Sequence, residues 1–149
     1  QYVMKKFFKS PKDIVVIAGD TIVSIDTEIL GKPQNSSEAK KMLRMLSNKT
    51  HKVFSGFSIL DSKSGKVITE VISTEVKFQK LDKNKIEWYV QTGEPFGKAG
   101  SYSIQGLGSI LVESISGSYN NVVGFPFEYI FPHLKKNGCI SFGEKKNDG

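Results

Sequence analysis

Cysteine is nearly absent from this chain, and long runs of apolar residues are absent as well. Cys139 is the single cysteine in 149 residues, which excludes a disulfide within the chain. No apolar stretch approaches the roughly 20 residues that a membrane-spanning helix needs. The stretch Met-Lys-Lys-Phe-Phe-Lys at positions 4–9 is too short and too charged for the apolar part of a secretory signal. We therefore expect no membrane association and a cytoplasmic setting.

Arginine is also scarce. Arg44 is the single arginine among 21 basic residues, and the formal net charge of the chain is +6. A positive surface favours anionic partners, among them nucleotides. Proteins that read base sequence typically use arginine forks, which lysine does not replace. The composition therefore argues against a nucleic-acid-binding protein.

Length and composition predict one domain. A chain of 149 residues with 38% hydrophobic and 11% aromatic residues is long enough to bury a single core. The sequence contains no repeat, low-complexity tract or linker. We expect one domain over residues 1–149, in which residues 143–149 form a disordered tail.

The most informative segment is the apolar run at positions 15–18, which leads into Asp20 and Thr21. Ligands bind beyond the carboxyl ends of buried α/β strands, so a carboxylate and a hydroxyl at such an end indicate the rim of an active site. A simple turn beginning at Asp20 explains the same residues equally well. Residues 26–31 predict a turn into a short second strand, which brings Lys32 back near Asp20 as a candidate for phosphate binding.

Local patterns predict a helix and a pair of strands in the next part of the chain. Asn35 and Glu38 form a capping-box pattern ahead of an amphipathic helix over residues 36–47. Two β-rich runs, at 50–60 and 66–78, are separated by a polar loop that contains glycine. Such a loop is typical of a hairpin, so the two runs predict an antiparallel pair.

The second half of the chain predicts two further helices and a strand. Asp82 is suited to cap a helix that ends at Gly93, and Pro126 is suited to open a last helix. Residues 109–115 predict a strand between them. His51 stands at the start of a strand with no second histidine or cysteine nearby, which favours a strand-edge residue over a metal ligand.

A glycine-rich loop at positions 93–108 is the second informative region. Its glycines permit positive φ and close approach of the backbone. Lys98 is suited to bind phosphate, and Gln105 can read a base or sugar through its amide, although such an amide more often braces its own loop. The loop differs from a Walker motif, because Thr92 and Ala99 replace the glycine and the hydroxyl residue of that motif.

Several short motifs occur in this chain in an order and spacing that are specific to one family. They are Asp-Thr at 20–21, Gly-Lys-Pro at 31–33, Glu-Ala at 38–39, His-Lys-Val at 51–53, Glu-Pro at 94–95, Lys-Ala-Gly-Ser-Tyr at 98–102, Ile-Gln-Gly at 104–106 and Gly-Ser-Tyr-Asn-Asn-Val-Val-Gly-Phe-Pro at 117–126. Over roughly residues 14–135 the chain resembles the Maf family of nucleoside triphosphate pyrophosphatases. It is similar to the branch acting on dTTP and UTP, which includes the Maf-like domain of eukaryotic acetylserotonin methyltransferase-like proteins.

The resemblance has implications for fold, activity and cofactor. It implies an α/β, Maf/ITPase-like fold, in which a mixed, curved sheet flanked by helices surrounds a nucleotide cleft. It implies hydrolysis of dTTP and UTP, and of modified nucleotides in a house-cleaning role, to the monophosphate and pyrophosphate. A divalent cation, Mg²⁺ or Mn²⁺, is also implied, with ligands that the sequence does not identify, and a homodimer is left open.

The resemblance also assigns roles by position. Asp20 is expected to accept the proton of the attacking water or to share in holding the metal, and Lys32 to contact phosphate. This is chemically coherent, because a carboxylate positions water and a lysine neutralises charge on the leaving pyrophosphate. Thr21 and Gln105 are expected to be specificity positions. Lys98 is expected to be a second cation or the structural partner of a nearby glutamate.

The chain departs from the family pattern in two places. The family carries a Ser-x-Ser-Pro-Arg-Arg segment that binds the triphosphate several dozen residues ahead of the Asp-Thr motif, and Ser-Pro-Lys at positions 10–12 does not correspond to it. Gly97 replaces the acidic residue that usually precedes Lys-Ala-Gly. We therefore expect an N-terminally incomplete Maf-like domain. Two interpretations stay open: a pyrophosphatase whose longer chain supplies the arginines, or a truncated, catalytically impaired nucleotide-binding module.

Overall fold

The computed structural model describes residues 14–140, which form an α/β fold around a five-stranded sheet. Strand order is β2-β1-β3-β4-β5. The strands are β1 (Val15–Ile25), β2 (Glu28–Leu30), β3 (Thr50–Asp61), β4 (Val67–Phe78) and β5 (Val112–Ser116). The helices are α2 (Ser36–Leu46), α3 (Lys83–Gln91), α4 (Tyr119–Val123) and α5 (Phe127–Lys136), with 3₁₀ turns η1 (Ala99–Ser101) and η2 (Gly106–Leu111). The predicted tail at 143–149 and the Ser-Pro-Lys stretch at 10–12 lie outside the described residues.

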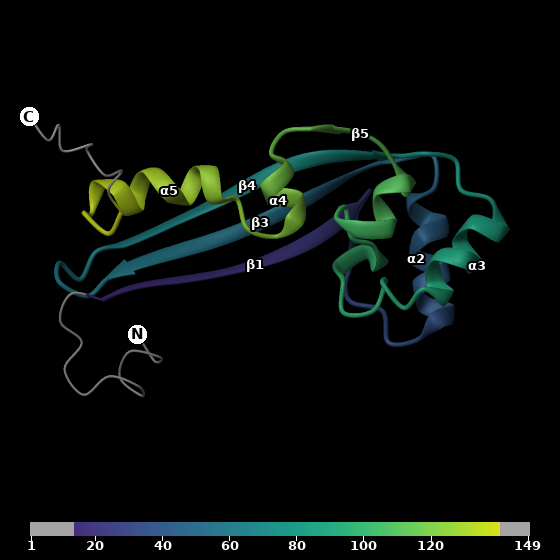
Figure 1. The fold of residues 1–149 in the computed structure, drawn as a ribbon, viewed down its shortest axis with the longest axis horizontal. Coiled ribbons are helices and arrows are strands. Elements are labelled where there is room, and N and C mark those ends of the chain that lie inside the picture. The colour runs from purple at the N-terminus through teal and green to yellow at the C-terminus, as the bar shows by residue number, and fades with distance from the viewer. Residues whose placement is uncertain (1–13, 141–149) are drawn as a thin grey trace, which may run out of the picture.

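The three long strands β1, β3 and β4 run side by side, and the helices cover different parts of them (Figure 1). Helices α2 and α3 gather at one end of the sheet, α5 lies along β3 and β4 toward the other end, and α4 lies between them. The hydrophobic core is likewise divided into two clusters. A larger cluster includes Leu43 and Tyr89, and a smaller one contains Phe57 and Ile130. The middle of β1 therefore lies between two packed regions.

The predicted helix termini are confirmed. The Asn35 side chain accepts a hydrogen bond from the backbone N–H of Glu38 at 2.9 Å, and α2 begins at the next residue after Asn35. The Asp82 side chain accepts one from the N–H of Lys85 at 2.8 Å at the start of α3. Each cap satisfies a backbone donor that has no partner inside the helix. The residues predicted for the apolar face of α2 are all buried: Ala39, Met42, Leu43 and Leu46.

Both predicted hairpins are confirmed. The runs at 50–60 and 66–78 form β3 and β4, which pair antiparallel. Strand β2 pairs antiparallel with the end of β1, with Leu30 opposite Val23. Because the chain reverses direction in this turn, Lys32 returns alongside the middle of β1, as the sequence predicted.

The position of Asp20 and Thr21 at the carboxyl end of a strand was a wrong prediction. Strand β1 continues through both residues to Ile25, and they pair with Gly56 and Ser55 in the middle of the sheet. The rule about carboxyl ends applies to parallel strands. Every strand pairing among the described residues is antiparallel, whereas the family resemblance implies a mixed sheet.

The strand predicted at 109–115 begins later than expected. Residues up to Leu111 form the 3₁₀ turn η2, and β5 starts at Val112. An extended conformation is blocked upstream because Gly106 has a φ of +79° and the N–H of Gly108 is bonded to the Glu94 side chain at 2.8 Å. The short helix α4 was not predicted. The last helix was predicted, and it begins directly after Pro126.

Candidate active site

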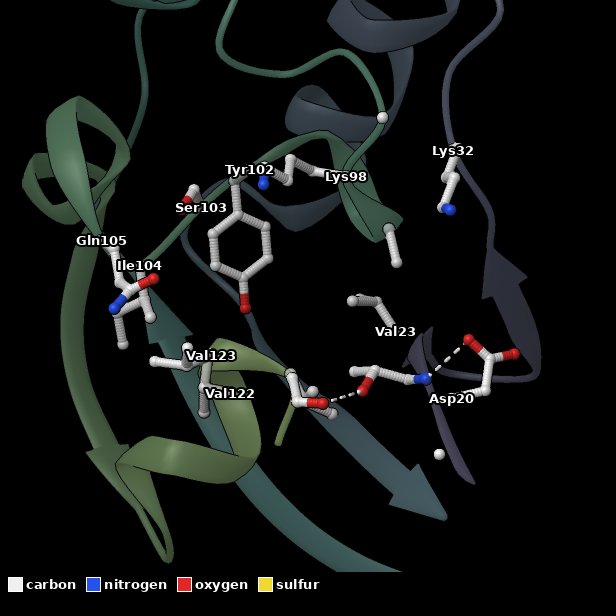
Figure 2. A pocket seen from close by; sticks show the side chains of 16 residues that line it. Asp20, Val23, Lys32, Lys98, Tyr102, Ser103, Ile104, Gln105, Val122 and Val123 are labelled. Atoms are coloured by element: carbon white, nitrogen blue, oxygen red, sulfur yellow. Dashed lines mark hydrogen bonds between the residues drawn. The ribbon is translucent and has the colours of Figure 1, made fainter. Parts of the chain in front are cut away.

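A cleft of about 290 Å³ lies between the middle of β1, the loop at 97–105 and the end of α4. Its lining includes every residue that the sequence analysis selected as a functional candidate: Asp20, Thr21, Lys32, Lys98 and Gln105. Figure 2 shows Asp20 and Lys32 on one side of this cleft and Gln105 on the other. The candidates therefore come together in space although they are spread over three separate parts of the chain.

Asp20 presents a carboxylate at the rim of the cleft. Its side chain is exposed, and Oδ1 accepts a hydrogen bond from the backbone N–H of Thr21 at 2.9 Å. Within residues 14–140, no hydrogen bond is made to Oδ2. One oxygen is thus oriented by the backbone while the other can meet a water molecule, a cation or a substrate.

Lys32 and Lys98 reach the cleft from two loops that are joined to each other. The backbone N–H of Gly100 donates to the carbonyl oxygen of Gly31 at 3.0 Å. This bond ties the residue before Lys32 to the turn that follows Lys98. Two ammonium groups at one cleft suit a polyanionic ligand, because each positive charge offsets part of the ligand's charge.

The alternative role of Lys98, as a partner of Glu94, has some support as well. Burial acts to raise the pKa of the Glu94 carboxyl, but hydrogen bonds from the N–H groups of Gly108 and Leu107 outweigh it. The Tyr89 hydroxyl and the positive charge of Lys98 add to this, so the pKa of Glu94 lies below its usual value. Lys98 therefore influences Glu94 and also lines the cleft.

Thr21 faces a polar network beneath the cleft. Its hydroxyl lies 2.7 Å from that of Ser55 on β3, and it donates to the carbonyl oxygen of Gly124 at 3.2 Å. The Ser55 hydroxyl also donates to the carbonyl oxygen of Asn121 at 3.1 Å. Residues on β1 and β3 are thereby connected to the end of α4, which forms one wall of the cleft.

The same network anchors α4 to the sheet. The Asn121 amide is fully buried and donates to the Val53 carbonyl at 3.0 Å and to the Thr74 hydroxyl at 2.9 Å. The Ser118 side chain caps α4 by accepting from the N–H of Asn121 and donates to the Glu128 carboxylate. The Asn121 amide nitrogen is thus paired on the sheet, while its Oδ1 is buried without a partner among the described residues, and the paired groups hold α4 in one position.

Gln105 lies at the start of η2, and its side chain is exposed. Its amide makes no hydrogen bond with any residue in the described range of 14–140. The geometry does not support a loop-bracing use of this amide, which the sequence alone leaves open. The bonds that hold the loop come from Glu94 and Tyr89 instead.

Tyr102 lines the cleft and was not selected as a candidate from the sequence, although it belongs to the Lys-Ala-Gly-Ser-Tyr motif. Its hydroxyl lies 2.8 Å from Nε2 of His51, and the two rings meet edge to face. His51 is 2% exposed, so the expectation of a strand-edge residue was wrong. Burial lowers the pKa of His51 from 6.5 to about 4, and the imidazole is therefore neutral near pH 7.

The residues of the cleft fit a metal ion that is coordinated mainly by phosphate oxygens of the substrate and by water, with few ligands from the protein. No group of three or more His, Cys, Asp and Glu side chains suited to a metal exists within residues 14–140. Asp20 is the one carboxylate in the lining. Magnesium is commonly bound by one or two carboxylates together with substrate phosphates and water. A single exposed carboxylate beside two lysines matches that arrangement better than a closed protein site.

One further finding concerns membranes. Among the helices that the structure describes, none combines the length and the apolar character needed to cross a bilayer.

Comparison with known proteins agrees with the geometry. The family model described as "Maf-like protein" matches residues 1–137. A dTTP/UTP pyrophosphatase of Syntrophus aciditrophicus (strain SB) is 40% identical over 136 residues, which cover 91% of this chain and 66% of that protein. The dTTP/UTP pyrophosphatase of Fusobacterium nucleatum subsp. nucleatum is 46% identical over 123 residues, covering 83% of this chain and 64% of that protein.

A third relative, the dTTP/UTP pyrophosphatase of Clostridium botulinum (strain Kyoto / Type A2), is 46% identical over 136 residues. That match covers 91% of this chain and 70% of the relative. The chain thus spans about two thirds of the length of the curated relatives that it matches. Because the family model covers nearly the whole chain and the same motifs line one cleft, this chain belongs to the Maf family.

Proposed function

We propose that this protein hydrolyses dTTP and UTP to the nucleoside monophosphate and pyrophosphate. The observation that carries the proposal is the arrangement of the cleft: the Gln105 amide, which has no hydrogen bond among the described residues, lies on one side, Asp20 and Lys32 lie on the other, and Lys98 lies between them. The relatives described above are named for this activity. Modified pyrimidine nucleotides, in a house-cleaning role, belong to the same substrate class.

The two sides of the cleft suggest how a nucleotide would lie in it. The base fits the side that carries Gln105, Ile104 and Val123, where an amide is combined with apolar side chains. The triphosphate fits the side of Lys32, with Lys98 within the same cleft, because ammonium groups pair with phosphate oxygens. In this orientation the phosphates extend toward Asp20.

The reaction then follows from ordinary acid–base chemistry. A water molecule attacks the α-phosphorus, the bond between that phosphorus and the oxygen bridging to the β-phosphate breaks, and pyrophosphate leaves. Asp20 accepts the proton that the water loses, through the carboxylate oxygen that has no backbone partner. Lys32 offsets the negative charge that develops on the departing pyrophosphate.

In the other role that the sequence leaves open, Asp20 would share in holding a Mg²⁺ or Mn²⁺ ion, together with phosphate oxygens of the substrate. When bound there, such an ion supplies positive charge that polarises the phosphate and neutralises the leaving group. Thr21 supports the site from below through its bonds to Ser55 and Gly124. We further propose that the enzyme acts in the cytoplasm. A homodimer stays a prediction.

A panel of nucleoside triphosphates, scored for pyrophosphate release by the full-length protein, tests the proposal. We expect dTTP and UTP to be hydrolysed faster than CTP and the purine triphosphates, and chelation of divalent cations to abolish turnover. Preference for a purine triphosphate, or release of single phosphates in place of pyrophosphate, would refute it.

The alternative, which the sequence leaves open, is a nucleotide-binding module with impaired catalysis. The residues 1–149 alone and a version extended by the upstream coding sequence distinguish the two. An in-frame Ser-x-Ser-Pro-Arg-Arg segment that restores turnover supports the enzyme. Binding without turnover in both versions supports the module.

A further inference from the structure

The part of the loop that carries Gln105, residues 103–108, is held on both sides of Gln105 by Glu94 near the start of the loop and by Tyr89 on helix α3. The Glu94 carboxylate accepts hydrogen bonds from the backbone N–H of Leu107 at 3.0 Å and of Gly108 at 2.8 Å. The Tyr89 hydroxyl accepts a bond from the N–H of Ser103 at 3.1 Å. Gln105 lies between these attachment points. The positions of the residues on either side of it are therefore set by Glu94 and Tyr89.

The two bracing side chains are themselves joined. The Tyr89 hydroxyl donates to the Glu94 carboxylate at 2.9 Å, and the Tyr89 side chain is fully buried. Burial raises the pKa of Tyr89, so its hydroxyl keeps the proton that it donates. Hydrogen bonds to a carboxylate are stronger than neutral ones, which makes this a rigid connection from helix α3 to the loop.

The glycines of the loop show how closely it is packed against this pair. A Cβ atom on Gly106 would lie 2.8 Å from the Glu94 carboxylate. A Cβ atom on Gly108 would lie 2.6 Å from the Tyr89 hydroxyl and 2.3 Å from the carbonyl oxygen of Ser103. No side chain fits at either position without moving these groups, so the loop has little freedom to shift.

Gln105 itself contributes nothing to the bracing. Its side chain is exposed in the cleft and makes no hydrogen bond with the described residues. Its backbone is thus fixed by neighbours while its amide is left for a ligand. Fixing the backbone on both sides of Gln105 limits the positions from which its amide reaches a ligand, so an amide that is well placed for one base edge is poorly placed for another.

We propose that Tyr89 and Glu94 are positioning residues for base selection, which act by fixing the loop that presents Gln105 to the nucleotide. The inference rests on the proposed function and adds to it the device that makes Gln105 selective. Neither residue lines the cleft. Tyr89 therefore acts on substrate choice through the loop, whereas Glu94 acts through the loop and through its charge near Lys98.

Tyr89→Phe in the full-length protein is the first test, since it removes the hydroxyl and keeps the buried ring. We expect the ratio of kcat/KM for UTP over CTP to fall by roughly three- to tenfold, because the variant loses the bonds of the hydroxyl to Ser103 and Glu94 and the loop that presents Gln105 loosens. The change should appear mainly in KM for UTP, because the reacting groups on the other side of the cleft are untouched. Tyr129→Phe, at an exposed tyrosine on α5, is the matched control and should leave the ratio unchanged.

A double-mutant cycle separates positioning from a general loss of stability. If Tyr89 acts through Gln105, Tyr89→Phe should change the UTP/CTP ratio no further in a Gln105→Leu background. Glu94→Gln, which keeps the shape of the side chain but weakens its acceptor, should behave in the same way. Hydrogen exchange at the N–H groups of Leu107 and Gly108 should speed up in both single variants.

The possible outcomes distinguish a failure of the positioning role from a failure of the proposed function. Hydrolysis of UTP with an unchanged ratio in Tyr89→Phe and Glu94→Gln overturns the positioning role and leaves the proposed function intact. Additive effects with Gln105→Leu also overturn it. A wild-type protein that neither hydrolyses nor binds any nucleoside triphosphate overturns the proposed function, and the positioning role with it.

Discussion

The hydroxyl of Thr21 lies 2.7 Å from the hydroxyl of Ser55, the residue opposite it on the neighbouring strand. Side chains alternate between the two sides of a strand, so Thr21 and the adjacent Asp20 cannot point the same way. Thr21 joins the polar network beneath the cleft, whereas the Asp20 carboxylate is exposed at the rim. Within the Asp-Thr motif, Asp20 is therefore free to take part in the reaction, and Thr21 attaches β1 to the wall of the cleft.

Asp20→Asn should lower kcat at least about a hundredfold while nucleotide affinity changes little, the size expected for removal of a general base. The asparagine oxygen can still accept the N–H of Thr21, so the strand should keep its geometry. Steady-state pyrophosphate release and calorimetric binding measure the two effects. Asp26→Asn, at the exposed turn between β1 and β2, is the control. Near-normal turnover of Asp20→Asn would reassign this residue to structure.

Lys32→Ala should raise KM for the triphosphate and make the remaining binding less sensitive to salt. An ammonium group that pairs with phosphate contributes a screened attraction, and this attraction disappears with the side chain. Affinity measured at several ionic strengths gives the slope. Lys66→Ala in the exposed β3–β4 turn should change neither quantity. If Lys32→Ala instead unfolds the protein, the phosphate assignment is wrong.

Gln105→Leu should reduce the preference for dTTP and UTP over CTP and purine triphosphates. A substrate that cannot complete a polar contact leaves the amide unpaired at a cost of about 1 to 3 kcal/mol, and leucine removes that discrimination. Ratios of kcat/KM across the nucleotide panel measure the effect, with Gln91→Leu as an exposed control. An equal loss of activity toward every nucleotide would leave Gln105 a purely structural role.

Thr21→Ala belongs to the same experiment as a comparison. We expect it to alter selectivity less than Gln105→Leu, because the Thr21 hydroxyl is engaged with Ser55 and Gly124 and a water molecule can take its place. It should lower the free energy of unfolding by about 1 kcal/mol, the net contribution of a hydrogen bond. Denaturant titration measures this loss. A larger change of selectivity than in Gln105→Leu would make Thr21 the main specificity position.

Acid should destabilise the protein through His51. Its pKa is 6.5 when unfolded and about 4 in the fold, so the unfolded chain binds the proton more readily. The stability contributed by the neutral imidazole is complete above pH 6.5 and is lost as the pH falls toward 4. The loss is on the order of 3 kcal/mol. Melting temperatures from pH 7 to 4 should fall less steeply in His51→Gln than in the wild-type protein. Equal slopes would contradict the assignment.

Local signals were enough to predict much of this fold. The caps at Asn35 and Asp82 and the apolar face of α2 were predicted correctly, because a cap or a helical stripe depends on residues a few positions apart. The hairpin that returns Lys32 to Asp20 depends on the same short range. The family motifs identified the candidate residues that line the cleft. Local patterns alone did not decide whether these residues are functional.

The tertiary structure decided the features that depend on distant contacts. The path of residues 106–111 follows from the bonds to Glu94, and the short helix α4 is held by Asn121, whose partners lie on β3 and β4. The burial of His51 depends on packing against Tyr102, which is distant in the chain. None of these pairings has a local signature, because hydrogen bonding and burial are set by whichever atoms the completed fold brings together. The sequence by itself thus determined which residues are candidates and which local elements form, and the packing of the chain decided which way each side chain faces.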